Sequence, residues 1–153
     1  MSEEIVPLIS SSVAGPLGIR HLPRFWLKIL LYAAGRLPEG YRHGAGGFDE
    51  LLTDSLGIDN AGFVAYIESH KPGYLQLEAW VKEHARKLTP ESVAALNHKI
   101  LTRDMNAEMA GERRERFGIA DPAFAHAVSL NDLDDWDQAH RRLTSSGSLS
   151  PAD

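Results

Sequence analysis

The sequence predicts an all-α protein, a compact single-domain helical bundle of about six to eight helices with a structured glycine-rich loop. Three observations predict this fold class. Apolar residues recur at steps of three and four along most of the chain. Helix-capping residues and prolines precede many of these segments, and glycine or proline follows them. No segment shows the sustained apolar–polar alternation of a half-buried strand.

The first element is a central helix within the apolar run Leu22–Leu37. Pro23 suits the first turn of a helix. The N–H groups of that turn have no acceptor within the helix, so the N–H that proline lacks is not missed there. The run is too short and too charged to span a membrane, so we expect neighbouring helices to bury it.

The remaining helices are expected where capping or stop signals bound an apolar stripe. In order they are Phe48–Leu56 with Gly57 as its stop, a helix capped by Asp59 or Asn60 and ended by Lys71-Pro72-Gly73, Tyr74–Leu88, Pro90–Asp104 capped by Thr89, Asn106–Phe117, Ala123–Val128 opened by Asp121-Pro122, and Asn131–Leu143. Outside this single domain of residues 15–143, we expect a flexible N-terminus over residues 1–14 and a disordered serine-rich tail over residues 144–153.

Composition excludes several classes of protein. The 153 residues are 43% hydrophobic and 24% charged, which excludes a disordered chain and a membrane protein. A formal net charge of −5 disfavours partners that are nucleic acids or anionic membranes. The absence of cysteine removes thiol catalysis, disulfides and cysteine-ligated metals, and no motif for a cofactor or a metal is visible. Because the N-terminus lacks the features of a signal peptide, we expect a cytoplasmic protein.

A polar stripe crosses the central helix. His21, Arg24, Lys28 and Tyr32 follow one another at steps of three and four, so they project from one face. Two cations and a histidine beside apolar surface suit an anion site, because arginine binds carboxylate or phosphate bidentately. The alternative is a solvent-facing stripe in which the two cations extend into water.

The loop Gly40–Gly47, called the glycine loop below, enters the next helix. Backbone N–H groups at such a helix start favour an anion, and the loop also carries Tyr41, Arg42 and His43. It matches neither a Walker loop nor the dinucleotide-binding fingerprint. Two plainer roles stay open, in which Asp49 only stabilises the helix start and His43 only fastens the loop.

Other polar and aromatic residues are less specific. Asn97 lies on the apolar face of its helix and must be hydrogen-bonded, either to another segment that it braces or to a ligand. Trp80 and Trp136 are expected to be core anchors first. The serines lack the context of a nucleophile elbow, which makes a serine hydrolase unexpected.

A combination of short motifs resembles a bacterial family, domain of unknown function 5069. The motifs are His21-Leu22-Pro23-Arg24, Leu37-Pro38-Glu39-Gly40-Tyr41-Arg42-His43-Gly44, Gly47-Phe48-Asp49, Leu56-Gly57-Ile58, Ala79-Trp80-Val81, Asn97 and Leu130–Trp136. The resemblance covers roughly Val6 to Leu143. It includes the polar residues chosen above, which supports the hypothesis that the central helix, the glycine loop and the Asn97 helix form one pocket.

The leading hypothesis is a helical domain that binds a small anionic molecule, with proton transfer by histidine if it is an enzyme of the lyase, isomerase or cyclase type. The candidate catalytic residues are His43, His21 and Asp49, and the candidate ligand-binding residues are Arg24, Lys28, Tyr41, Asn97, Gly44 and Gly46. The alternative is a non-catalytic module that binds a partner protein or itself through Tyr74–Leu88 and Asn106–Phe117. Nucleic-acid binding ranks third, because Glu112 and Glu115 interrupt the arginine cluster of residues 113–116.

Overall fold

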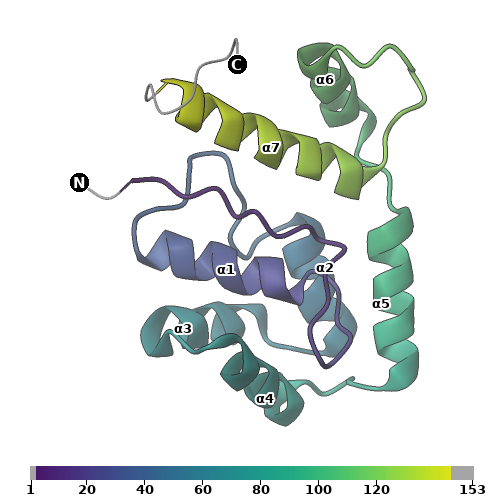
Figure 1. The fold of residues 1–153 in the computed structure, drawn as a ribbon. Coiled ribbons are helices and arrows are strands. Elements are labelled where there is room, and N and C mark those ends of the chain that lie inside the picture. Colours follow the sequence, from purple (N-terminus) through teal and green to yellow (C-terminus); the bar gives the residue numbers. More distant parts are fainter. Residues whose placement is uncertain (1–2, 146–153) are drawn as a thin grey trace. The chain divides into compact units, whose positions relative to one another are not determined.

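The protein is described here by a computed structural model that covers residues 3–145 (Figure 1). Within that range the chain forms seven helices and no strand, which confirms the all-α prediction. The helices are α1 (Leu22–Ala33), α2 (Gly47–Leu56), α3 (Asn60–His70), α4 (Tyr74–His84), α5 (Pro90–Thr102), α6 (Ala107–Phe117) and α7 (Ala127–Ser145). None of these helices is long and apolar enough to cross a membrane.

The chain divides into two compact units, one reaching to Leu101 and the other starting at Thr102. The single domain over residues 15–143 and the flexible N-terminus therefore stay predictions. The predicted disordered tail lies outside the described residues from position 146 onward, and its first two residues belong to α7.

The first unit has an apolar core to which α1, α2, α3, α4 and α5 all contribute. Phe25 of α1 and Phe63 of α3 are fully buried, and their ring centroids lie 4.6 Å apart. The other large side chains that are fully buried in this unit are Ile19, Leu22, Ile29, Leu52, Leu56, Ile67, Leu77, Leu96 and Ile100. Their burial supplies the main favourable free energy for packing these helices.

Local sequence signals account for most helix boundaries in this unit. Pro23 lies in the first turn of α1, and Gly57 ends α2 in the left-handed conformation that glycine adopts most easily. The Asp59 carboxylate accepts the Gly62 N–H and caps α3. Thr89 caps α5 by accepting the Ser92 N–H at 3.0 Å.

The second unit pairs α6 with α7. Arg116 of α6 forms an ion pair with Asp134 of α7 at 3.0 Å. The predicted helix Ala123–Val128 is wrong, because the Asp121 carboxylate accepts the Ala123 N–H in a turn and α7 begins only at Ala127. Trp136 was expected in the core but is 60% exposed.

Candidate functional site

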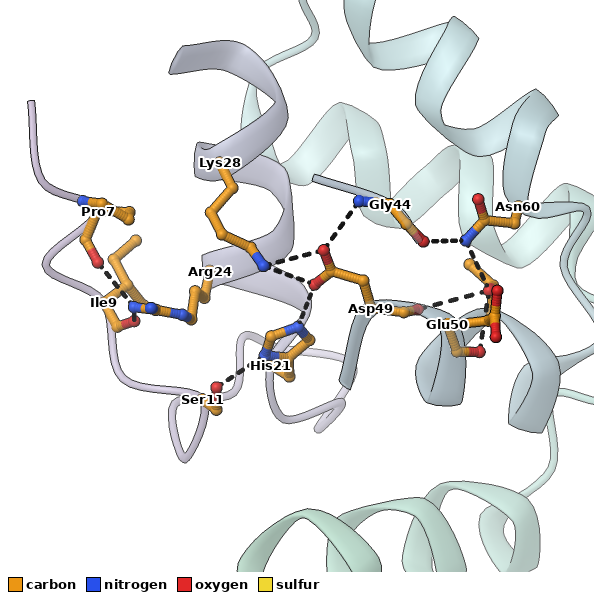
Figure 2. A network of polar contacts seen from close by, with 11 residues as sticks. Pro7, Ile9, Ser11, His21, Arg24, Lys28, Gly44, Asp49, Glu50 and Asn60 are labelled. Atoms are coloured by element: carbon orange, nitrogen blue, oxygen red, sulfur yellow. Dashed lines mark hydrogen bonds and ion pairs between the residues drawn. The ribbon is translucent and has the colours of Figure 1, made fainter. Parts of the chain in front are cut away.

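His21 lies at the centre of a buried hydrogen-bond network in the first unit (Figure 2). Its Nε2 lies 2.6 Å from Asp49 Oδ1, and its Nδ1 lies 2.9 Å from Ser11 Oγ. All three residues are at most 2% exposed. The backbone of His21 has a φ of 73°, the left-handed conformation, which histidine adopts more readily than most residues other than glycine. His21 is also the N-cap residue of α1.

Asp49, in the first turn of α2, is the acceptor that joins the network together. Lys28 Nζ lies 2.8 Å from its Oδ1 and 2.9 Å from its Oδ2, which makes a buried ion pair between α1 and α2. The Gly44 N–H donates to Oδ2 at 2.9 Å. Together with His21, these donors satisfy both oxygens of a carboxylate that is almost completely removed from water.

Burial and charge set the protonation states. Burial lowers the pKa of His21 to about 4, although the hydrogen bond and the charge of Asp49 act to raise it. Burial would raise the pKa of Asp49, but the hydrogen bond from His21 and the charge of Lys28 outweigh it and lower the pKa to about 2. Burial also lowers the pKa of Lys28, against the attraction of Asp49. At neutral pH the network therefore holds a neutral imidazole and an ionised carboxylate.

The network fixes the glycine loop through both backbone groups of one residue, Gly44. Gly44 donates its N–H to Asp49, and its carbonyl accepts Asn60 Nδ2 at 2.8 Å. Its backbone φ is +125°, a value that residues with a side chain rarely adopt, and an added Cβ would lie 3.0 Å from Val64. The backbone conformation thus favours glycine at this position, and a Cβ would fit only if the Val64 side chain shifted.

Arg24 connects α1 to the N-terminal segment. The side chain is 5% exposed, and its Nη1 donates to the carbonyl oxygens of Pro7 at 2.9 Å and Ile9 at 2.8 Å. Its guanidinium also lies 5.9 Å from the centre of the Tyr41 ring. These contacts hold residues 7–9 against α1.

The predicted stripe on α1 is thus mostly buried. The solvent-facing alternative is wrong for His21, Arg24 and Lys28, each at most 5% exposed, whereas Tyr32 is 47% exposed. The sequence predicted that Lys28 and Arg24 bind a ligand. In the structure both side chains contact protein groups.

The histidine of the glycine loop stands apart from the carboxylate. His43 stacks on Tyr32 with ring centroids 3.8 Å apart, and its Nδ1 lies 3.4 Å from the Tyr41 carbonyl oxygen. Asp49 orients His21 instead. Gly46 is the N-cap of α2 and offers no side chain to cap it.

Asn97 braces the chain just before α1. Its Oδ1 accepts the Arg20 N–H at 3.0 Å, and its Nδ2 donates to the Gly18 carbonyl at 2.8 Å. Both polar groups of the amide are therefore used by this loop, which matches the bracing interpretation. A single pocket that also includes Asn97 stays a prediction.

Sequence reasoning missed two members of the network. Ser11 lies in a segment without helical periodicity, and no motif marks it. Asn60 was considered only as a helix cap, yet its side chain holds Gly44. No local pattern marks either contact, because Asn60 lies 16 positions from Gly44 and Ser11 lies 10 positions from His21. Among the described residues, no group of three or more His, Asp or Glu side chains is arranged to hold a metal ion.

Residues 8–139 match the family model "Domain of unknown function (DUF5069)". The chain belongs to this family. The matched range agrees closely with the range expected from the motifs, and it contains every residue of the network from Ser11 to Asn60. A search of curated proteins found no match to this DUF5069 chain.

Proposed function

We propose that this chain binds a small anionic molecule, carrying a carboxylate or a phosphate, where the glycine loop enters α2. One observation carries the proposal: side chains from outside the loop hold both backbone groups of Gly44, the buried Asp49 at its N–H and the half-buried Asn60 at its carbonyl. A loop that is fixed before a ligand arrives loses little conformational entropy on binding.

Arg42 supplies the charge. A Cβ atom added at Gly47 would lie 2.7 Å from Arg42 Nη1, and one added at Gly46 would lie 3.1 Å from the same atom. The exposed guanidinium therefore lies against the backbone at the start of α2, where helix N–H groups and the helix dipole also favour an anion. Asp49 would repel an anion there, but its charge is paired with Lys28.

The proposal assigns different work to the two cations on α1. Lys28 contacts Asp49 and Arg24 contacts two carbonyls, so both act as positioning residues beneath the ligand rather than as its direct contacts. His43, half-buried against the exposed Tyr32, is the histidine best situated to exchange a proton with a bound molecule. His21 is the second candidate, from beneath the loop.

Thermal unfolding with inorganic phosphate, acetate and succinate tests the binding. A ligand at 100 times its Kd adds about 2.7 kcal/mol to the free energy of unfolding. We expect Arg42→Gln to lose this stabilisation and Arg86→Gln, a change at an exposed arginine outside the loop, to keep it. Equal stabilisation of both variants, or no stabilisation of the unmodified chain by any of the three anions, would contradict the proposal.

Proton transfer is tested by the ring resonances of the histidines. On addition of a stabilising anion, the ring signals of His43 are expected to shift, whereas those of the exposed His98 on α5 stay in place. If His43 does not respond to a bound anion, it has no part in the chemistry.

A second candidate function is binding to a partner protein or to another copy of this chain. It is favoured by the 60% exposure of Trp136 and the 48% exposure of Leu143, which lie seven residues apart and so share a face of α7. Sedimentation equilibrium would show a mass that rises with concentration and falls back in Trp136→Ser. A constant monomer mass, together with no loss of partner binding in that variant, would argue against this role.

A further inference from the structure

Ser11, His21 and Asp49 form a directed chain of hydrogen bonds. Because Asp49 is ionised, it can only accept, so His21 Nε2 carries the proton and donates across 2.6 Å. The neutral ring then leaves Nδ1 as an acceptor, and the Ser11 hydroxyl donates to it across 2.9 Å. The bond order is hydroxyl to imidazole to carboxylate, which is the polarity that turns a serine into a nucleophile.

We propose that Ser11 is a nucleophilic serine that accepts the acyl group of an activated ester, with His21 as its general base and Asp49 as the positioning residue. The constellation is recognised by geometry and roles rather than by sequence motifs. In serine proteases the hydroxyl bonds Nε2 and the carboxylate bonds Nδ1, whereas here the two ring nitrogens exchange roles. Either nitrogen can take the proton, since each carries a lone pair in one neutral tautomer.

The covalent step balances without any further reactant. Ser11 Oγ forms a bond to the acyl carbon while its proton passes to His21 Nδ1. The bond from the carbonyl carbon to the leaving oxygen or sulfur breaks, and the leaving group departs with that electron pair. The proton on Nδ1 then neutralises the leaving group as an alcohol or thiol, and water returns the serine by the reverse roles.

Access requires only a local opening of the N-terminal segment. Ser11 itself is 2% exposed, but Leu8 and Val13 on either side are 59% and 43% exposed. The segment thus reaches the surface on both sides of the serine, and its ties to α1 include the two hydrogen bonds from Arg24. Local openings of such surface segments need far less free energy than global unfolding.

The burial of His21 predicts a characteristic pH profile. Burial keeps the imidazole in its basic form over most of the pH range, and the charges of Lys28 and Arg24 act in the same direction against Asp49. Acylation of Ser11 should therefore be nearly independent of pH between about 5 and 8, whereas a surface histidine would lose its activity as a base near its ordinary pKa of about 6.5.

Labelling with a fluorophosphonate tests the proposal on the intact folded chain. Ser11 Oγ would form a bond to phosphorus and fluoride would leave, and peptide mass spectrometry identifies the labelled residue. We expect label on Ser11, none at that position in Ser11→Ala, and unchanged labelling in Ser12→Ala, the adjacent half-buried serine. Because asparagine also tolerates the left-handed conformation, His21→Asn is the matched variant for the base, and its rate should fall about 100-fold.

Three results would overturn the proposal: no label on Ser11, labelling of Ser11 at the same rate in His21→Asn, or equal labelling of the chain unfolded in urea. Mapping the label on the unmodified chain does not depend on how any variant folds. Asp49→Asn should slow the reaction, and the ring nitrogen resonances of His21 should show loss of the Nε2–H tautomer that Asp49 fixes, which an aspartate with only a structural role would not cause. Anion binding at the glycine loop is read by stabilisation instead, so each proposal can fail alone.

Discussion

Acidification to about pH 4.5 is expected to weaken the first compact unit through His21. In the folded chain this imidazole is neutral, because burial lowers its pKa from 6.5 to about 4. The unfolded chain binds a proton there as the pH falls below 6.5, and the folded chain does not. The contribution of His21 to stability is therefore complete above pH 6.5 and is lost as the pH falls toward 4.

The magnitude follows from the two pKa values. Each unit between them corresponds to about 1.4 kcal/mol, so at pH 4.5 the free energy of unfolding should be lower than at pH 7 by about 2.5 kcal/mol. Asp49 adds little in this range, since its pKa moves from 3.8 to about 2 and its contribution is lost only below pH 3.8. The pH window thus separates the two groups.

Tryptophan fluorescence during urea unfolding can report on this unit alone. The chain has three tryptophans, of which Trp26 and Trp80 lie in the first unit. In a Trp136→Phe background the signal comes from those two, and the exposed position of Trp136 makes the substitution mild. Free energies of unfolding are then measured at pH 7 and pH 4.5, with and without His21→Asn.

We expect the His21 protein to lose about 2.5 kcal/mol between the two pH values and the asparagine variant to lose less than about 0.5 kcal/mol. The variant should also be less stable at pH 7, because it loses the hydrogen bonds that the imidazole makes to Asp49 and Ser11. An equal loss in both proteins would place the titrating group elsewhere. A His21 protein whose stability is unchanged at pH 4.5 would show that this imidazole is not held neutral.

Three further substitutions test the supports of the site. Asp49→Asn leaves Lys28 buried without its counterion and should lower the free energy of unfolding by about 3 to 5 kcal/mol, measured by urea unfolding, with partial recovery when Lys28→Met is added. Asn97→Ala removes two hydrogen bonds to the loop before α1 and should cost about 1 to 3 kcal/mol, with faster hydrogen exchange at the Arg20 amide; unchanged exchange would refute the bracing role. Gly44→Ala should cost about 1 to 3 kcal/mol because of its φ of +125°, and anion binding should weaken as well; full stability would show that the loop can adopt another conformation.

The helices were predictable because their signals are local. Pro23 at the start of α1 and Thr89-Pro90 at the start of α5 act within one turn of the chain, and the structure keeps both. The one helix that was wrongly predicted had an ambiguous local signal. Asp121-Pro122 can begin a turn as well as a helix, and here the chain makes a turn.

The site was only half predictable for the opposite reason. Periodicity put His21 and Lys28 on one face of α1, but it could not say whether that face meets water or protein. Their partner Asp49 lies 28 and 21 positions away, so the pairing depends on how α2 packs rather than on any pattern within either helix. Ser11 was missed because its segment is irregular and its role comes only from the hydrogen bond to His21.

The buried ion pair is better explained by position than by stability. Replacing such a pair with apolar residues is often neutral or stabilising, so helix packing alone gives no reason for Lys28 and Asp49 to be buried together. Helices α1 and α3 already pack through Phe25 and Phe63. What apolar contacts cannot fix is irregular backbone, which needs hydrogen bonds of defined direction. Asp49 supplies such a bond to the glycine loop, and Arg24 supplies two to the segment before Ser11, while His21 holds the Ser11 side chain. The two proposed activities depend on these two segments.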